Sequence, residues 1–590
     1  MATIAAGIAA TAAGLTYLDG KYHIRQDLSM RRAQGKGTKM FQKAVREKRI
    51  SPYYFFERYA QAQPSEECIW WHGGSYTWDA AYSRANQYAH FFLAQGVKPN
   101  DLVSFFMVNS PDFVLAWMGL WAIGAAPALI NHNLSQQALL HCLGIAGSRL
   151  VFADGPDGLL ERLDAVEDSL SASEVRIIKL ASVRDEIAAL PTTRPPDDLR
   201  AEVTPTSAFG LFYTSGTTGL PKACIVPAIA GFMHGASREC GYAYVTPTGD
   251  KARPERYYDC MPLYHGTGGI SGMTQLVTGQ TLCLAPKFST SRFWDDVRAS
   301  RATWFVYVGE TLRYLLAAPP SPLDKAHSVR GIYGNGLRPD VVGHHGLLSR
   351  WRFRNVLVPV AIDAETGDIA RDAKTGFATR VPYEVGGEIL VRQPATVTPA
   401  FPGYFKNEEA TAKKYVYDVF QKGDCYYRTG DALRRDADGR WFFLDRLGDT
   451  FRWKGENVST AEVSETLGRY PGVSEATVYG VSLPGHDGKA GMAAIYINSE
   501  ASRFDYKGLL KHARAHLPRY AVPIFIRQLV ARSATHNNKQ DKVPLKKAGV
   551  DPGQMNGDLL FWISENGKGD EYVPFTSTEF ESLQTGRAKL

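Results

Sequence analysis

The chain has 590 residues, of which 44% are hydrophobic and 22% charged; this composition excludes a wholly disordered protein and indicates at least two folded domains. Its seven cysteines show no C-x-x-C pair and no secretory spacing, so we expect reduced intracellular thiols. The net charge of +7 is concentrated at 21–49, where ten Lys or Arg face two acidic residues. No zinc, helix-turn-helix or RNA-binding signature accompanies this charge, so nucleic acid is not expected as a partner.

The N-terminal segment 1–50 joins an apolar, small-residue run at 1–18 to this basic stretch. An apolar run followed by basic residues is typical of a segment that lies on or in a membrane with its flank toward the cytosol. The run is barely long enough to span a bilayer. Membrane association is therefore one prediction for this segment, and a packed N-terminal helix is the other.

Helical and strand patterns alternate after this segment. We predict helices over 76–95 and 111–121 and strands over 102–108 and 149–153, which favours a mostly parallel sheet covered by helices. A further strand-like stretch is predicted at 201–213.

A smaller sheet is predicted closer to the C-terminus, with strands over 386–392 and 441–444. A charged turn at 445–449 is expected to separate this sheet from a final helix-and-strand block. We therefore place a domain boundary at the turn.

The most specific motif lies at 213–222 and reads YTSGTTGLPK. Two glycines let the backbone turn tightly and direct N–H groups at an anion, while hydroxyl side chains and Lys222 supply further donors. It is not a Walker A loop, because only two residues separate Gly216 from Gly219 and Ala223 follows the lysine. The motif predicts a triphosphate site, and a flexible surface loop is the alternative.

Other motifs accompany this loop: NSPDF at 109–113, APALIN at 126–131, PLYH at 262–265, GNGLRP at 334–339, YRTGD at 427–431 and DRLGDTFRWKGENV at 445–458. With them the chain resembles the acyl-CoA synthetases of the adenylate-forming superfamily, and within it the fatty-acid transport protein/very-long-chain acyl-CoA synthetase family. The resemblance implies an α/β fold. It consists of a large N-terminal domain of mixed, mostly parallel sheets flanked by helices (51–447) and a small, mobile α+β C-terminal domain (448–590).

The resemblance implies an ATP-dependent ligase that joins a long- or very-long-chain fatty acid to coenzyme A through an acyl-adenylate, with ATP, Mg²⁺ and coenzyme A as cofactors. Thr217 and Lys222 would take part in catalysis at the phosphates, Thr217 and Thr218 would lie near Mg²⁺, and Asp431 would accept both ribose hydroxyls, since an ionised Asp only accepts hydrogen bonds. The implied nucleotide-binding residues are Tyr213, Thr214, Ser215, Gly216, Thr217, Thr218, Gly219, Lys222, Gly334, Asn335, Gly336, Asp431 and Arg446.

The C-terminal motifs imply the rest of the reaction. Lys539 aligns with the lysine that bridges the carboxylate and the α-phosphate, a task that suits a point-like ammonium, and Lys542 is the alternative. The small domain is expected to rotate about Gly448, because glycine tolerates a large φ/ψ change. His265 either lines the carboxylate pocket or packs in the core. The residues expected to face the pantetheine thiol are Lys454, Gly455, Glu456 and Asn457.

One part of the family pattern is missing. The aromatic-Gly-x-Thr-Glu string, which stacks on adenine and supplies a glutamate to Mg²⁺ in the family, is absent, so an internal deletion is inferred near 340–342. Either an incorrect gene model skipped an exon or this is a genuine protein that cannot adenylate. The second explanation favours another function, a membrane-associated fatty-acid transport or binding protein with little or no ligase activity.

The chain ends with Ala588, Lys589 and Leu590, a conservative variant of the Ser-Lys-Leu terminus that a peroxisomal import receptor reads. We therefore predict a peroxisomal location at or near the membrane, with other membranes or a lipid droplet as alternatives. A different acid, such as a secondary-metabolite or bile-acid-like carboxylate, is a third possibility for the substrate.

Overall fold

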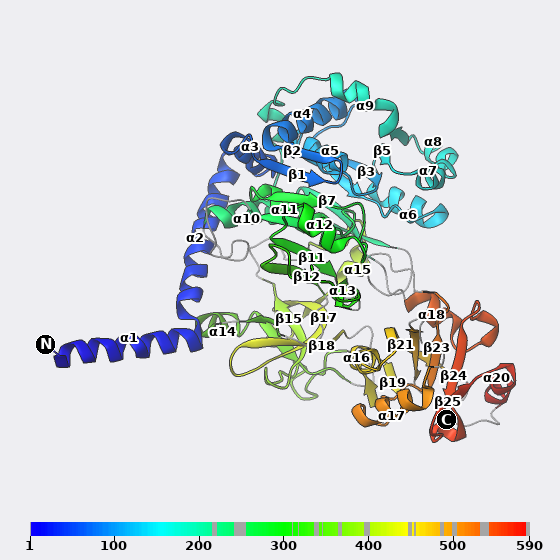
Figure 1. Cartoon of the computed structure of the whole chain (residues 1–590). Coiled ribbons are helices and arrows are strands. Elements are labelled where there is room, and N and C mark those ends of the chain that lie inside the picture. Colours follow the sequence, from blue (N-terminus) through cyan, green and yellow to red (C-terminus); the bar gives the residue numbers. More distant parts are fainter. Residues whose placement is uncertain are drawn as a thin grey trace. The chain divides into compact units, whose positions relative to one another are not determined.

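The computed structural model describes residues 2–214, 221–240, 255–308, 311–316, 318–335, 341–344, 346–363, 368–393, 402–446, 451–453, 456–483, 489–497, 504–531 and 542–585. The chain forms two compact units (Figure 1). The first contains Met1–Gly336, Gly346–Leu348 and Gln393–Tyr415, and the second contains Leu337–His345, Ser349–Arg392 and Val416–Leu590. The predicted boundary at 447–448 lies outside the described residues and stays a prediction.

The first unit holds two six-stranded sheets. In one, the strand order is β12-β11-β9-β10-β1-β2, and in the other it is β6-β5-β3-β4-β7-β8. Neighbouring strands are parallel except for the β1–β2 and β7–β8 pairs, which confirms the mostly parallel arrangement predicted from the alternating pattern. The strands are β1 (Glu67–Trp71), β2 (Gly74–Thr77), β3 (Leu102–Met107), β4 (Ala126–Leu129), β5 (Leu150–Asp154), β6 (Arg176–Lys179), β7 (Ala208–Thr214), β8 (Lys222–Pro227), β9 (Arg256–Asp259), β10 (Thr281–Leu284), β11 (Trp304–Val308) and β12 (Gly331–Asn335).

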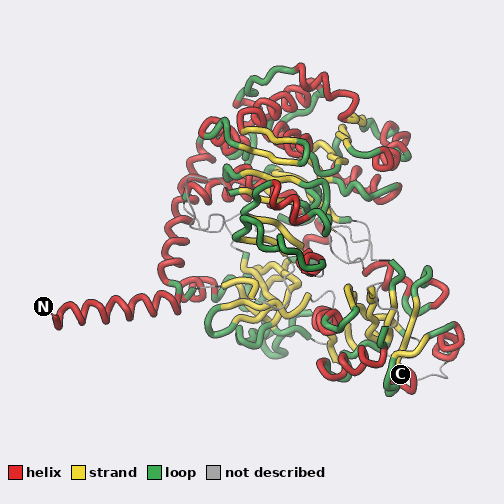
Figure 2. Tube along the Cα trace, in the orientation of Figure 1, coloured by secondary structure: helices red, strands yellow, loops and turns green. Residues whose placement is uncertain are grey.

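Helices cover both sheets of this unit, and Figure 2 shows them as red tubes around the yellow strands. Helix α10 packs on β7 and β8, α11 packs on β9, β10 and β11, and the two helices contact each other, so they lie between the sheets. The helices are α1 (Ala2–Tyr22), α2 (Ile24–Arg46), α3 (Tyr53–Ala62), α4 (Trp78–Ala94), α5 (Pro111–Ala122), α6 (Gln136–Ala146), α7 (Asp157–Asp164), α8 (Glu167–Ser171), α9 (Leu180–Ala189), α10 (Ala228–Glu239), α11 (Gly266–Val277), α12 (Phe293–Ala299), α13 (Thr311–Leu316) and α15 (Glu408–Ala412).

Local chemistry explains where the predicted helices begin. The Thr77 hydroxyl accepts the Ala80 N–H at 3.2 Å and begins α4, and the Ser110 hydroxyl accepts the Phe113 N–H at 3.1 Å ahead of Pro111. These two helices confirm the predictions over 76–95 and 111–121 to within two residues. The predicted strand over 201–213 is wrong in its first half. There, Thr204 and Ser207 exchange backbone–side-chain hydrogen bonds that stabilise a turn, and the strand begins at Ala208.

The N-terminal residues form two successive helices, α1 and α2. One face of α2 packs on α10, with the Phe41 and Phe232 ring centroids 5.6 Å apart, while the basic side chains of α2 are exposed. Among the described residues, none of the helices has the length and the apolar character needed to cross a membrane.

The second unit contains a six-stranded sheet. Five of its strands are antiparallel in the order β13-β18-β17-β15-β14, and β16 also pairs with β17. The strands β15 and β18 confirm the smaller sheet predicted from 386–392 and 441–444. The predicted turn at 445–449 is wrong at its start, because Asp445 and Arg446 still pair with β17. The strands are β13 (Val341–His344), β14 (Leu357–Val360), β15 (Gly387–Arg392), β16 (Tyr415–Tyr417), β17 (Cys425–Arg435) and β18 (Arg440–Arg446), and α14 spans Leu347–Phe353.

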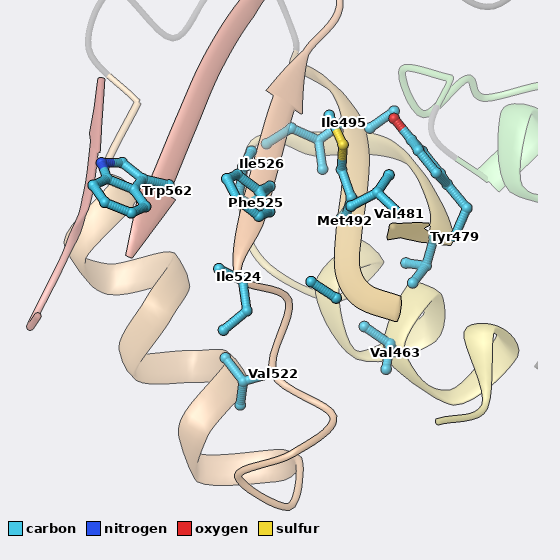
Figure 3. Packing of buried hydrophobic residues seen from close by; sticks show 14 of the residues in the cluster. Val463, Tyr479, Val481, Met492, Ile495, Val522, Ile524, Phe525, Ile526 and Trp562 are labelled. Atoms are coloured by element: carbon cyan, nitrogen blue, oxygen red, sulfur yellow. The ribbon is translucent and has the colours of Figure 1, made fainter. Parts of the chain in front are cut away.

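The C-terminal part of this unit has its own core, drawn in Figure 3. Its sheet runs in the order β21-β22-β23-β24-β25, and the fully buried Met492 of β22 and Phe525 of β23 lie in its core. This part confirms the predicted α+β block. Its elements are β19 (Phe451–Trp453), β20 (Glu456–Val458), α16 (Thr460–Gly468), β21 (Val473–Ser482), β22 (Lys489–Ile497), α17 (Tyr506–His516), β23 (Phe525–Gln528), α18 (Lys542–Ala548), β24 (Leu559–Ile563), α19 (Ser564–Gly567), β25 (Tyr572–Pro574) and α20 (Ser577–Gln584).

Candidate nucleotide-binding site

The predicted phosphate loop connects two antiparallel strands, β7 and β8. Thr214 and Lys222 are cross-strand partners, and the Thr214 hydroxyl donates to the Lys222 carbonyl at 3.3 Å, so the two ends of the loop are held side by side. The Lys222 ammonium lies 5.2 Å from the centroid of the Tyr404 ring. The loop residues between these ends, Ser215, Gly216, Thr217, Thr218 and Gly219, lie outside the described residues.

Strand β7, which leads into the loop, is fixed by aromatic side chains. The indole N–H groups of Trp117 and Trp121 both donate to the Phe209 carbonyl, at 2.9 and 3.0 Å. The Tyr213 hydroxyl donates to the Cys142 carbonyl at 2.7 Å, and burial raises the pKa of Tyr213 far above its usual value. Tyr213 is therefore a neutral anchor for the strand, and its contact with a nucleotide stays a prediction.

Gly334 lies on β12, where the backbone of β11 approaches closely. A Cβ atom at this position would lie 2.0 Å from the Tyr307 carbonyl oxygen, its cross-strand partner, so no larger residue fits. Asn335 continues the strand, but its side chain and Gly336 lie outside the described residues. The predicted glycine at 334 thus has a packing requirement of its own, besides its predicted approach to adenine and ribose.

Asp431 lies in a β-bulge of the second unit. Between the pairs Glu388–Ala432 and Leu390–Arg428, one residue of β15 faces three residues of β17. Gly430, in the middle of the three, has a φ of +75°, a conformation that glycine adopts without strain. A bulge of this kind redirects the neighbouring side chain, which here is the predicted ribose acceptor Asp431.

The predicted nucleotide contacts Asp431 and Arg446 lie directly opposite each other in the β17–β18 ladder. The structure therefore brings together two residues that are 15 positions apart in the sequence. Nothing is described of the Arg446 side chain itself.

Glu388, a fully buried carboxylate on β15 beside this bulge, was not predicted from the sequence. It accepts hydrogen bonds from Arg428 Nη2 at 2.8 Å and from the Gly430 N–H at 3.1 Å. Burial on its own lowers the pKa of Arg428, but the hydrogen bonds and charge of Glu388 outweigh it, and the pKa is raised. A charged residue in the otherwise apolar string EILV was the available signal.

His265 begins α11 as its N-cap, and its Nδ1 accepts the Thr267 N–H at 3.3 Å. The segment before it is held by the buried Asn109, whose amide donates to the Met261 carbonyl at 2.8 Å and accepts the Leu263 N–H at 2.8 Å. Asn109 is thus a second residue whose role the sequence did not reveal. The capping contact accounts for a polar residue at 265, and its role in a carboxylate pocket stays a prediction.

The predicted residues of the C-terminal part are only partly described. Lys539, Gly448, Lys454 and Gly455 lie outside the described residues. The backbones of Glu456 and Asn457 form β20 opposite β19. The alternative lysine, Lys542, donates to the Thr460 hydroxyl at 3.2 Å. Within the described ranges, no three His, Cys, Asp or Glu side chains form a metal-binding group, and the predicted magnesium residues Thr217 and Thr218 lie outside them.

The inferred deletion near 340–342 follows β12, which forms the edge of its sheet and pairs with β11 alone among the strands that the structure describes. Ile332 and Tyr333 on this strand are 42% and 56% exposed. After β12 the next described strand, β13, belongs to the other unit's sheet. Exposed hydrophobic side chains on an edge strand are unusual, since such edges are normally covered or protected.

Comparison with known proteins identifies the family of this chain. Residues 56–346 match the AMP-binding enzyme family, and residues 462–539 match the AMP-binding enzyme C-terminal domain. The chain is 42% identical to isopenicillin N epimerase component 1 of Hapsidospora chrysogena over 98% of this chain and 97% of that protein. It is 34% identical to the very long-chain fatty acid transport protein of Cochliobolus heterostrophus over 100% and 96% of the two chains. With the medium/long-chain-fatty-acid–CoA ligase FadD6 of Mycobacterium tuberculosis it shares 35% identity over 87% of each.

A solved structure of the anthranilate CoA ligase AuaEII, in complex with anthranoyl-AMP, shares the fold with a TM-score of 0.67; it covers 85% of this chain and 97% of its own at 18% identity. The fold and the motifs thus define an AMP-forming acyl-CoA ligase, a class that uses ATP and coenzyme A. The chain belongs to the AMP-binding enzyme family, in its fatty-acid transport protein/very-long-chain acyl-CoA synthetase branch.

The same comparisons bear on the inferred deletion. The alignment with the Cochliobolus heterostrophus protein runs over 641 positions, whereas this chain has 590 residues. Several dozen positions of the relative therefore have no counterpart here. In addition, the match to the AMP-binding enzyme family ends at residue 346, soon after the inferred deletion.

Proposed function

We propose that this protein activates long- or very-long-chain fatty acids for peroxisomal metabolism and couples this activation to fatty-acid uptake. The observation that carries the proposal is the bulge that presents Asp431 opposite Arg446, because a carrier without turnover has no need of a ribose acceptor. The relatives named as fatty-acid transport protein and fatty-acid–CoA ligase support the acid class.

In the proposed reaction, different residues act at the phosphates and at the carboxylate. The loop from Thr214 to Lys222 binds the β- and γ-phosphates, and Thr217 and Thr218 would help to hold Mg²⁺, which would supply positive charge to offset that of the phosphates. The carboxylate oxygen of the fatty acid attacks the α-phosphorus and pyrophosphate leaves, with Lys539 neutralising the two anions that meet. The thiol of coenzyme A then attacks the acyl carbon: the new C–S bond replaces the C–O bond to AMP, AMP leaves, and the thiol proton is released to solvent.

The experiment is a purified-protein assay for AMP and pyrophosphate formed from ATP, with fatty acids of increasing chain length and with coenzyme A. We expect both products only when fatty acid is present, with long or very long chains preferred. Fatty-acid binding without either product would favour the second candidate, a membrane-associated transport or binding protein. The missing magnesium-glutamate motif favours that candidate.

A third arm of the same assay tests another acid. The relative at 42% identity is named as a component of isopenicillin N epimerase, so a secondary-metabolite acid belongs among the substrates tried. Turnover with such an acid and none with fatty acids would keep the ligase chemistry and replace the substrate.

The N-terminal helices support the proposed contact with a membrane surface. The buried face of α2 contains Ala33, Gly37 and Ala44, and its remaining faces expose basic side chains such as Lys36 and Lys39. On α1, Leu15 and Tyr17 are 59% and 67% exposed. Basic residues near an anionic bilayer contribute about 1 kcal/mol each, so this segment is suited to lie on such a surface.

The proposed peroxisomal location rests on Ala588, Lys589 and Leu590, which lie outside the described residues. Deleting Lys589 and Leu590 is expected to leave a fluorescently tagged protein outside peroxisomes, whereas changing Lys36 and Lys39 to Gln is expected to preserve import and weaken membrane retention. Co-localisation with a peroxisomal marker and membrane fractionation measure the two effects. An unchanged location after the deletion would refute the import signal, and location on other membranes or lipid droplets would then be the next candidate.

A further inference from the structure

The bulge at Thr429, Gly430 and Asp431 removes backbone groups from the β15–β17 ladder, and these groups need other partners. The Ile389 carbonyl accepts the Thr429 hydroxyl at 2.7 Å, and Thr429 Oγ1 also lies 3.1 Å from the Asp431 N–H, which it accepts. The Gly430 N–H has its acceptor in Glu388 Oε1 at 3.1 Å. Two side chains therefore replace the ladder hydrogen bonds that the bulge interrupts.

Glu388 is the unusual member of this arrangement, because its residue exposure is 0%. A buried carboxylate is costly unless charge and hydrogen bonds compensate it. Arg428 provides this compensation, with Nε 3.2 Å from each carboxylate oxygen and Nη2 2.8 Å from Oε2. Arg428 Nη1 also donates to Asp368 at 3.2 Å, so the guanidinium is held from two sides.

The hydrogen bonds require two acceptor oxygens at position 388. Oε1 serves the Gly430 N–H, and Oε2 serves Arg428 Nη2. A glutamine amide has one acceptor and one donor group, so in either orientation it would turn an N–H toward another N–H. The network therefore distinguishes a carboxylate from its isosteric amide: the amide N–H would face either the Gly430 N–H or the Arg428 guanidinium, so one of the two contacts at this position is lost in either orientation.

We propose that Glu388 is a positioning residue for nucleotide binding: by holding the Gly430 N–H from the buried side of the sheet, it fixes the bulge that aims Asp431 at the ribose hydroxyls. This inference rests on the proposed role of Asp431. If Asp431 is already held in place before the nucleotide binds, no free energy is needed to order it on binding. In this way a supporting contact strengthens the hydrogen bonds of a binding residue to its ligand.

The test compares ATP with 2′,3′-dideoxyATP, which lacks both ribose hydroxyls, as equilibrium ligands of the full chain. For the unaltered protein we expect ATP to bind about tenfold or more tightly than the dideoxy analogue, as is usual when a charged acceptor loses its donors. Glu388→Gln is expected to weaken the binding of ATP alone, so that ATP binds at most about twofold more tightly than the dideoxy analogue. A protein that is merely destabilised would lose affinity for both nucleotides equally, and the ratio of the two affinities would stay unchanged.

Glu57→Gln is the matched control. Glu57 is also a buried glutamate, 6% exposed, held by the Arg194 guanidinium and by the Tyr82 hydroxyl at 2.9 Å, but it belongs to the first unit, outside the bulge. This variant is expected to lower thermal stability while keeping the nucleotide preference. If Glu388→Gln fails to fold, Gly430→Ala addresses the same bulge, since an added Cβ meets no atom within 4 Å and only strains the φ of +75°.

The results distinguish the ribose-binding role of Asp431 from the positioning role of Glu388. If the unaltered protein binds ATP and the dideoxy analogue equally, Asp431 is not the ribose acceptor, and both the proposed site and this inference fail. A ratio that stays high in folded Glu388→Gln and in Gly430→Ala overturns only the positioning role of Glu388. Loss of preference in these variants, with retention in Glu57→Gln, establishes it.

Discussion

Inserting the missing family segment between Asp340 and Val341, ahead of β13, is expected to raise fatty-acid-dependent pyrophosphate release about a thousandfold. The aromatic-Gly-x-Thr-Glu string in that segment would add an adenine-stacking surface and a carboxylate ligand for Mg²⁺. The stacking surface would hold the adenine in place, and the carboxylate would hold Mg²⁺, whose charge would offset the negative charge that accumulates as the fatty acid meets the α-phosphate. The measurement is the initial rate of pyrophosphate release by the chain as it stands and by the extended chain.

The structure gives a second reason to expect this gain. Ile332 and Tyr333 are exposed on β12, whose outer edge has no partner strand among the described residues. A strand added beside β12 would pair its free backbone groups and bury part of these side chains. The extended chain is therefore also expected to unfold at a higher temperature.

The control is the same insertion with the glutamate of the string changed to Gln. This variant is expected to keep the gain in stability and lose most of the gain in rate, which separates the metal ligand from the completed sheet. Equal rates with and without the insertion would show that the chain does not need the motif. Sequencing the transcript across codons 335–345 distinguishes a skipped exon from a genuine deletion, and an uninterrupted cDNA that matches this chain would exclude the skipped exon.

Local patterns predicted the elements that depend on nearby residues. Thr77 and Ser110 begin their helices through hydroxyls that reach backbone N–H groups three residues ahead, so the sequence alone locates them. Local patterns predicted the wrong element boundaries at 201–213 and 445–449. At 201–213 a turn stabilised by Thr204 and Ser207 competes with the strand, and at 445–449 the pairing of Arg446 with Asp431 extends the strand into a charged segment.

The candidate site likewise contains residues that a local motif predicts and residues whose contacts depend on distant parts of the chain. Motif resemblance predicted Asp431, and the structure explains how a bulge presents it. Glu388 could not be predicted as its support, because 40 residues separate it from Arg428 and only the antiparallel pairing of β15 and β17 brings them together. Asn109 is more distant still, 152 residues from Met261. Contacts at such separations depend on the topology of the sheets, which composition and spacing do not specify.

Lys539→Ala is expected to slow acyl-adenylate formation by about two to three orders of magnitude, the usual cost of removing one donor that stabilises developing negative charge. The second step, attack of coenzyme A on an acyl-adenylate supplied from outside, is expected to keep its rate, because the family exchanges this lysine for the thiol tunnel when the small domain rotates. The two steps are measured separately, as pyrophosphate release and as thioester formation. The protein used is the chain as it stands or the extended chain, whichever releases pyrophosphate faster.

Lys542→Ala is the matched control, since Lys542 is three positions away and carries the same charge. Its ammonium donates to the Thr460 hydroxyl at 3.2 Å, so its loss is expected to cost a little stability and to leave both steps close to their original rates. If Lys542→Ala abolished adenylation and Lys539→Ala did not, the catalytic role would move to Lys542. A loss of both steps in Lys539→Ala would instead indicate damage to the fold of the small domain. Selective loss of the first step is the result that a lysine bridging two anions requires.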